Sequence, residues 1–275
     1  MMSINNSEQF DRGIFDFAYK FLLRLPNVTD ELIDKHIKHN PKNVPRDMSR
    51  LYRRLLISAQ NTQMSKNVIS KSMDNGIDSL RDILMDFSPH LVLEKYSLDW
   101  KLLLHDIIQN VSPRGKIRTG PRSIWPRFTQ SIIDGAAFLN EFSDLRDFNN
   151  WVKKFDEDSR ARGGLPMVLG SEIRGFSFAL SCDFLKEIGY ENFGKPDIHL
   201  KTIFYNLQIV YKKDDYQVFW AIDRIANHNN KKPYMVDKLF WLIGSGRFHL
   251  EDDLFTGRNR YEFIKEAISE LHQYY

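Results

Sequence analysis

The stretch Lys195-Pro196-Asp197-Ile198-His199-Leu200 opens an amphipathic segment whose apolar residues continue at helical spacing through Ile203, Phe204 and Leu207. Aspartate is a preferred N-cap, and Pro196 biases the residue before it toward an extended backbone, so a helix is expected to start at Asp197. Apolar residues recur at helical spacing in almost every other segment, and strand-like alternation is nearly absent. The sequence therefore predicts an all-α fold.

The same spacing places the other helices, and proline, glycine and asparagine mark the joints between them. Two early helices are expected around residues 14–22 and 48–59. Later helices are expected at residues 91–96, 100–108, 128–142, 148–155, 175–188, 198–207, 216–226, 234–243 and 260–275. No internal repeat or low-complexity tract interrupts this pattern.

Length and composition limit the class of protein. The chain has 275 residues, of which 42% are hydrophobic and 13% aromatic, which is enough for a substantial core. The net charge is only +3, so any contact with nucleic acid has to come from a local cluster of cations. The first ten residues lack the apolar core of a signal peptide, and no later stretch approaches a membrane span. A cytoplasmic protein without membrane contact is therefore expected.

Side chains that could hold a metal are few. Cys182 is the only cysteine, which excludes an intramolecular disulfide, a four-cysteine iron–sulfur cluster and a cysteine-based zinc site. His36 and His39 are one helical turn apart but have no further ligands near them in the sequence. The sequence therefore predicts no metal and no other cofactor.

A second motif, Leu55-Leu56-Ile57-Ser58-Ala59-Gln60-Asn61-Thr62-Gln63, ends a different amphipathic helix in a polar turn. A side chain that fills the gap left by a flipped nucleotide has to be short, planar and able to hydrogen-bond the orphaned base, and Gln60 meets these demands. Asn61 beside it is a further candidate DNA contact. The alternative is structural, with Gln60 ending one helix beside Asn61 and Thr62, which cap the next helix.

Together, the Asp197 and Gln60 motifs resemble the paired signatures of the helix-hairpin-helix DNA glycosylases, the endonuclease III-like superfamily. The run 55–60 is similar to that family's leucine-leucine-serine-alanine-glutamine segment and is the most specific match. The resemblance implies two helical lobes with the active site between them. Residues 1–44 would pack with a C-terminal helical lobe, 191–275, and residues 45–190 would form a helical barrel with the hairpin. A monomer bound to double-stranded DNA is expected.

The resemblance gives Asp197 the catalytic role. Base excision breaks the C1′–N bond through a cationic sugar, so a carboxylate near C1′ stabilises that charge and positions or deprotonates the attacking water. Capping is the structural alternative, and the two roles are compatible because the family places its catalytic aspartate at such a helix start. His199 is expected to support this site and to contact DNA.

The family precedes its catalytic aspartate with a hairpin of leucine-proline-glycine-valine-glycine type, whose backbone N–H groups hold a DNA phosphate. The segment 163–175 occupies that place, and Leu165-Pro166, Val168 and Gly170 resemble the pattern, although the glycines do not align. Phosphate contact by Gly170 and Arg174 is one interpretation. An ordinary turn between helices is the other.

Family members that also cut the DNA strand carry a lysine at the start of the helix after the hairpin, where its amine attacks C1′. Residues 171–185 contain no lysine, and Arg174, the nearest cation, stays protonated and cannot act as the nucleophile. The sequence therefore predicts a monofunctional glycosylase, in which water attacks with the help of Asp197.

Residues 112–128 hold five cations and no acidic residue. Glycine and proline are expected to keep this segment out of regular structure, and Trp125 and Phe128 could stack on a base or anchor the loop to the core. We interpret the segment as a DNA contact and Trp125 and Phe128 as candidates for a base pocket; a solvated loop with an aromatic anchor is the alternative. The expected phosphate contacts are Arg114, Lys116, Arg118, Arg122 and Arg127.

Two other functions remain open at this stage. A non-catalytic DNA-binding protein could keep the fold without the chemistry, as the imperfect hairpin and the missing lysine would permit. A glycosylase-like protein could also act on RNA or on free nucleosides. The identity of the excised base does not follow from the sequence.

Overall fold

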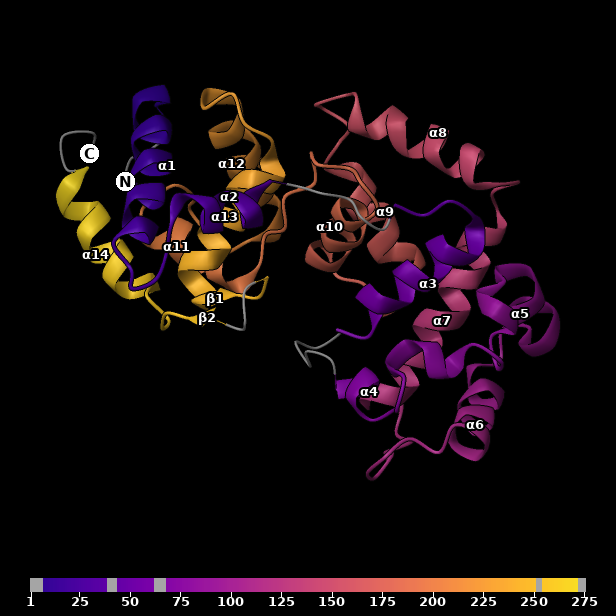
Figure 1. The fold of residues 1–275 in the computed structure, drawn as a ribbon. Coiled ribbons are helices and arrows are strands. Elements are labelled where there is room, and N and C mark those ends of the chain that lie inside the picture. The colour runs from indigo at the N-terminus through magenta and orange to yellow at the C-terminus, as the bar shows by residue number, and fades with distance from the viewer. Residues whose placement is uncertain (1–6, 39–43, 62–67, 251–253, 272–275) are drawn as a thin grey trace. The chain divides into compact units, whose positions relative to one another are not determined.

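The structure is a computed structural model that describes residues 7–38, 44–61, 68–250 and 254–271 (Figure 1). Helices make up most of these residues, and the only strands among them are β1, Arg247–Phe248, and β2, Leu254–Phe255, which pair antiparallel. The predicted all-α class is confirmed at this level, whereas the two-lobed glycosylase arrangement stays a prediction. No helix in the described ranges has the length and apolar content needed to cross a bilayer.

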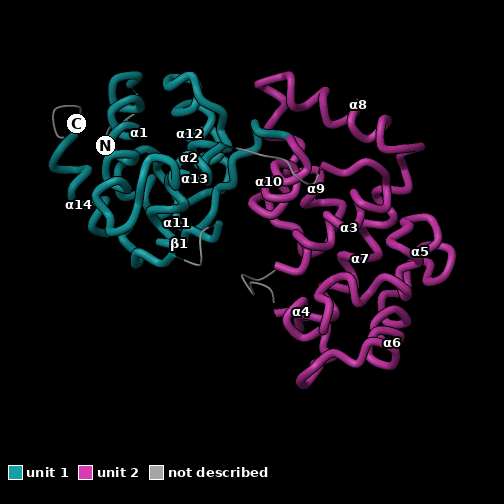
Figure 2. The backbone as a smooth tube through the Cα atoms, in the orientation of Figure 1, with its two compact units in different colours: residues 1–41, 190–275 teal, residues 42–189 magenta. Residues whose placement is uncertain are grey.

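The chain divides into two compact units, which Figure 2 distinguishes by colour. Unit 1 consists of Met1–Pro41 and Tyr190–Tyr275, and unit 2 is the continuous segment Lys42–Gly189. The domain boundaries expected from the sequence, after residues 44 and 190, fall beside these limits. The helices of unit 1 and those of unit 2 come from separate segments of the chain.

Unit 1 surrounds a helix from the C-terminal part of the chain. Its elements are α1 (Glu8–Leu23), α2 (Asp30–Ile37), α11 (Ile198–Asn206), α12 (Asp215–His228), α13 (Pro233–Ser245), the β1–β2 pair and α14 (Arg260–Glu270). Helix α13 packs against α1, α2, α11, α12 and α14, and its buried residues Val236, Leu239 and Phe240 belong to the core. The N-terminal helices α1 and α2 therefore complete a core whose other half follows residue 197.

A buried ionic network joins α1 to α12. Asp11 is fully buried, and its two carboxylate oxygens accept hydrogen bonds from Arg224 at 2.7 and 3.0 Å. Nδ1 of His228 lies 2.7 Å from the same carboxylate, and the Asn229 amide donates to the Asp11 carbonyl. A buried carboxylate needs such partners, because removing one of them leaves an uncompensated charge.

Unit 2 is built around α7. Its elements are α3 (Met48–Ala59), α4 (Val68–Lys71), the 3₁₀ helices η2 (Gly76–Leu80) and η3 (Met85–Phe87), α5 (Pro89–Tyr96), α6 (Trp100–Asn110), α7 (Ile124–Asn140), α8 (Leu145–Asp156), α9 (Gly164–Glu172) and α10 (Phe178–Glu187). Helix α7 packs against α3, α5 and α6. The close approach of α3 and α7 requires Gly135, because a Cβ atom there would lie 2.8 Å from Leu55.

Two helices cover residues for which the sequence predicts no helix, and both contain a proline in the first turn. Helix α7 starts at Ile124 rather than 128, with Pro126 inside it, and α9 covers residues that we had assigned to the hairpin, with Pro166 inside it. A proline at this position removes an N–H group that has no partner within the helix anyway. These prolines therefore belong to helix starts.

Candidate catalytic site at Asp197

Asp197 caps helix α11 with one carboxylate oxygen. Its Oδ1 accepts hydrogen bonds from the backbone N–H groups of His199 at 2.8 Å and Leu200 at 3.0 Å. Among the residues that the structure describes, Oδ2 accepts no hydrogen bond. The cap thus uses one oxygen and leaves the other available, so capping and chemistry do not compete for the same atom.

The segment that leads into Asp197 is fixed to α12 and α13. The Lys195 backbone N–H donates to Oδ2 of the buried Asp237 at 3.0 Å. Gly194 lies so close to the neighbouring helices that a Cβ atom there would be 2.6 Å from Ile222 and 3.1 Å from the Pro233 carbonyl oxygen. The backbone before Asp197 is therefore held in place before any ligand arrives.

Burial raises the pKa of the Asp197 carboxyl above its usual value, and the nearby Asp237 adds to this increase. The charge of His199, the backbone hydrogen bond from Leu200 and Lys195 act in the opposite direction. A raised pKa makes a carboxylate a stronger base toward a bound water molecule, provided that it is ionised.

His199 occupies a space that a glycine creates. A Cβ atom on Gly244 of α13 would lie 2.4 Å from the His199 Cβ, so only glycine admits this side chain. Its Nδ1 atom is buried and has no hydrogen-bond partner among the described residues. Burial lowers the pKa of His199; Asp197 opposes this effect, and Arg260 and Arg258 reinforce it. His199 is therefore expected to be neutral near pH 7.

Lys201, which follows Asp197 on α11, forms an ion pair with Asp215 at the start of α12. The hydrogen bond of Lys195 to Asp237 is made by its backbone N–H and does not involve its amine. In helix α10, the first lysine is Lys186, which is buried and whose Nζ lies 3.8 Å from Asp183.

Gln60 is the C-cap of α3 and points into the protein rather than out of it. Its side chain is only 4% exposed, and Oε1 has no hydrogen-bond partner in the described part of the chain. Asn61 is partly buried and donates from its amide to the Ile57 carbonyl at 3.4 Å. The wedge role stays a prediction and requires Gln60 to leave this position. Thr62 and the following residues through Asn67 lie outside the described residues.

The turn between α9 and α10 lies later in the sequence than we expected. Gly170 lies inside α9, whereas the turn itself is Ile173-Arg174-Gly175-Phe176-Ser177, with Gly175 at φ +87°. Gly170 therefore lies within a helix, whereas Arg174 lies in the turn at the end of the segment 163–175. The expected contact of Gly170 and Arg174 with a DNA phosphate stays a prediction.

Helix α7 holds this turn in place. The Arg174 backbone N–H donates to Oδ2 of Asp134 at 3.0 Å, and the Arg174 guanidinium pairs with the same carboxylate. The Ser131 hydroxyl donates to the Arg174 carbonyl. Ser177 accepts from the Leu180 N–H and so caps α10. Arg174 thus has a structural partner, although most of its side chain remains exposed.

The basic segment between α6 and α7 is an irregular loop, as expected, up to residue 123. Arg114, Lys116, Arg118 and Arg122 are exposed, and Arg127 lies on α7 and is partly buried. Arg114 anchors the loop: its N–H donates to the Ser72 carbonyl at 2.7 Å, and its guanidinium lies 3.6 Å from Asp74. This anchor fixes one end of the loop that carries Lys116 and Arg118, and their contact with DNA stays a prediction.

Trp125 and Phe128 do not line an open pocket. Both are buried in unit 2, where their rings meet edge to face at 6.1 Å. Because α7 begins at Ile124, helical spacing turns the two rings toward the core instead of leaving them on the loop. The structure supports the anchor interpretation of these residues and not the base-stacking one.

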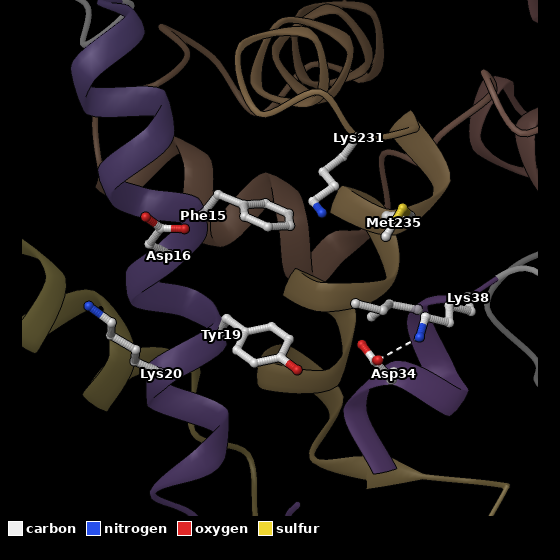
Figure 3. Close-up of a pocket in the computed structure, with 9 residues that line it drawn as sticks. Phe15, Asp16, Tyr19, Lys20, Asp34, Lys38, Lys231 and Met235 are labelled. Atoms are coloured by element: carbon white, nitrogen blue, oxygen red, sulfur yellow. Dashed lines mark hydrogen bonds and ion pairs between the residues drawn. The ribbon is translucent and has the colours of Figure 1, made fainter. Parts of the chain in front are cut away.

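Of two cavities in the described part of the chain, the first is lined by no predicted site residue, and the second lies beside Arg114, whose guanidinium pairs with Asp74. In unit 1, a cavity of about 610 Å³ lies between α1, α2 and α13, and Figure 3 shows Phe15 extending from α1 toward Lys231 and Tyr19 extending from α1 toward Asp34. Burial, together with a hydrogen bond to Asp30, raises the pKa of Tyr19 to about 12. Charges of both signs line this cavity. A second cavity, of about 740 Å³ in unit 2, contains Asp74, Asp78 and Asp82 together with Arg81.

No family model, no curated protein and no solved structure matches the chain. Within the described ranges, no group of three or more His, Cys, Asp or Glu side chains is arranged to hold a metal ion. The resemblance to the glycosylases therefore rests on the sequence motifs, and the site at Asp197 has to be judged by its own geometry.

Proposed function

We propose that the protein is a monofunctional DNA glycosylase, in which Asp197 assists water in hydrolysing the N-glycosidic bond of a flipped nucleotide. The observation that carries this proposal is that the two oxygens of the Asp197 carboxylate have different surroundings. Oδ1 is held by two backbone N–H groups, while Oδ2 has no partner among the described residues. A carboxylate fixed in this way needs little reorganisation to face a developing sugar cation.

The surroundings of Asp197 favour hydrolysis by water over attack by an amine. Lys201 is paired with Asp215, and α10 has no lysine before Lys186. Neutral His199 is suited to accept or donate one hydrogen bond beside the carboxylate without competing for its negative charge. Water is therefore the nucleophile in this proposal, and the product is an abasic site in an intact strand.

Replacing Asp197 with Asn tests the chemistry. Asparagine is also a good N-cap, so the fold and the DNA affinity should be retained. Base release from lesion-bearing duplexes should fall by at least about two orders of magnitude, which is the loss typical of removing one group that stabilises charge in a transition state. Thermal unfolding of both proteins is the control. Base release by the variant within a few-fold of wild type would remove Asp197 from the mechanism.

The same assay tests the absence of lyase activity. Product strands should break only after hot alkali, and borohydride should trap no covalent protein–DNA adduct, because residues 171–185 contain no lysine and Lys201 is paired with Asp215. A trapped adduct that disappears in Lys195→Gln or Lys201→Gln would replace water by a lysine nucleophile. A protein that binds duplex DNA but releases no base from any lesion would instead favour the non-catalytic alternative, in which Asp197 is a cap only.

A further inference from the structure

The C-terminal segment brings arginines and exposed aromatic rings together on unit 1. We call Arg247, Phe255, Arg258, Arg260 and Tyr261 the C-terminal arginine surface. Phe255 is 58% exposed and Tyr261 64% exposed. The Arg247 guanidinium lies 5.8 Å from the Phe255 ring centre, and that of Arg260 lies 4.9 Å from the Tyr261 ring centre. This composition is unlike that of an ordinary solvated loop, in which exposed large aromatic rings are few.

The backbone of this segment is fixed against the end of α13. Gly246 has φ +66°, and a Cβ atom there would lie 1.8 Å from the Gly257 carbonyl oxygen. The backbone segments at Gly246 and Gly257 are therefore in direct contact. The Thr256 N–H donates to the Gly246 carbonyl at 2.9 Å, and the Asn259 amide donates to the Thr256 carbonyl at 3.1 Å. Arg258 and Arg260 therefore project from an anchored turn at the start of α14.

Neither arginine has an acidic partner in the described part of the chain. Arg258 is exposed and makes no ion pair there, and Nε of Arg260 is buried without an acceptor. A buried guanidinium N–H without an acceptor is costly, and an anion is the partner that removes this cost. Many other surface arginines of the protein, such as Arg12, Arg24 and Arg50, are paired with carboxylates.

The two arginines lie beside the candidate catalytic site. Helix α14 packs against α11, and the positive charges of Arg260 and Arg258 are near enough to lower the pKa of His199. The His199 Nδ1 atom is also buried without a partner. Nδ1 of His199 and Nε of Arg260, both buried and without a hydrogen-bond partner among the described residues, thus come from two helices that pack together, and Arg258 lies two residues before Arg260.

We propose that Arg258 and Arg260 form a phosphate-binding subsite next to His199, which holds a backbone phosphate of the DNA strand on which Asp197 acts. Guanidinium groups bind phosphate through charge-assisted hydrogen bonds, and the exposed rings of Phe255 and Tyr261 suit contact with an unstacked base nearby. The identity of the phosphate as part of DNA rests on the proposed function. The existence of an anion site does not.

Inorganic phosphate and the His199 ring provide a direct test. In the full-length protein, phosphate should shift the ring resonances of His199 in a saturable way and raise its pKa, because the bound anion offsets the two positive charges. In the double variant Arg258→Gln/Arg260→Gln the response should be lost, and the pKa of His199 without phosphate should be higher than in wild type. The Lys265→Gln variant is the matched control, because Lys265 is exposed on the same helix, about 140° around its axis from Arg260.

Arg260→Lys separates charge from packing, since it keeps the cation and should retain part of the phosphate response. The subsite is overturned if wild-type His199 does not respond to phosphate, or if the double variant responds as wild type does while its circular dichroism shows a folded protein.

Binding to duplex DNA distinguishes this proposal from the proposed function. With Asp197→Asn as the background, the dependence of log affinity on log salt should flatten by about 0.9 for each lost phosphate contact, and by about twice that in the double variant. Lys265→Gln should leave the slope unchanged. If base release occurs but the double variant keeps the wild-type slope, the subsite fails and the glycosylase stands. If the slope falls but no lesion is excised, the subsite stands and the glycosylase fails.

Discussion

At the scale of single residues, Asp197 performs a structural task with one oxygen and leaves the other without a protein partner. Its position is set by the α11 cap and by the bond from Lys195 to Asp237, not by contacts with a ligand. The burial of this capping carboxylate affects stability, because its raised pKa makes the charged form unfavourable in the folded protein.

The pH dependence of stability should therefore identify Asp197. Its folded pKa lies above the unfolded one, so its contribution to stability is fully present below the unfolded pKa and is lost as the pH rises through the folded pKa. Asn at this position keeps the cap without the charge. We expect Asp197→Asn to match wild type at low pH and to be more stable at neutral pH, by about 1.4 kcal/mol per unit of pKa difference. Denaturant unfolding at several pH values measures this, and equal stability curves at all pH values would contradict it.

His199 contributes with the opposite sign. Its pKa is lowered in the folded protein, so its contribution is present above the unfolded value and is lost as the pH falls through the folded pKa. Because the two groups interact, removal of the Asp197 charge should lower the pKa of His199 further. The NMR titration of His199 in Asp197→Asn is the control that separates the two residues.

Gln60 illustrates a residue whose environment the sequence could not supply. The motif 55–60 predicts a helix end, and α3 ends at Ala59 with Gln60 as its C-cap, as the structural alternative requires. The inward direction of the side chain and its unpartnered Oε1 depend on packing. A buried amide oxygen without a hydrogen-bond partner costs about 1–3 kcal/mol. An outward rotation of Gln60 would expose Oε1 to water and remove this penalty, which would offset part of the free energy needed for the rotation.

At the scale of elements, helices were predictable wherever a long apolar period is present, as in α12 and α13. The predicted start of α7 at residue 128 is wrong, because Pro126 stands in the first turn of this helix and does not precede it. Helix α9, which contains Gly170, was not predicted, because the resemblance to the family's hairpin indicated an irregular segment there. Helix α2 was not predicted, although Thr29 before it is an N-cap that accepts a hydrogen bond from the Leu32 N–H.

The candidate site was predictable only in part, for the same reason. Asp197 and His199 follow from a local motif, since the cap is formed within four residues. The glycine that admits His199 and the arginines near it lie more than forty residues away in the sequence, on α13 and at the start of α14. These residues come close together only because α11, α13 and α14 pack against one another, and the spacing of apolar residues in the sequence does not indicate that packing.

The basic loop between α6 and α7 gives a prediction at this scale. Lys116 and Arg118 are exposed, so replacing both with Gln should weaken binding to every duplex about equally and flatten the log–log salt slope by about 0.9 for each phosphate contact. Base preference should not change. Lys153→Gln/Lys154→Gln, an equally exposed pair on α8, is the control with the same loss of charge. Equal slopes for the two double variants would make the loop an ordinary solvated segment.

At the scale of the whole molecule, the two units differ in how the chain builds them. Unit 2 is one continuous segment, whereas unit 1 combines α1 and α2 with everything after residue 190. Residues of α1 supply a large share of the unit 1 core, namely Phe10, Ile14, Phe15, Phe21 and Leu22. Burial of each such side chain contributes about 1.5–3 kcal/mol, so together they are comparable to the 5–15 kcal/mol stability of a typical domain.

The fragment 42–189 should therefore fold alone, and the fragment 190–275 should not. In the first fragment, α7 keeps all its partners, α3, α5, α6 and α9, and the turn at Gly175 keeps its bonds to Asp134 and Ser131. In the second, Arg224 loses Asp11 and α13 loses both N-terminal helices. Circular dichroism and thermal unfolding should give a cooperative helical transition for 42–189 and none for 190–275. Adding a peptide that spans residues 1–41 should restore helical structure in 190–275, because the missing core residues and Asp11 are all on that peptide. Cooperative unfolding of 190–275 by itself would mean that α1 and α2 cover the core without being needed to form it.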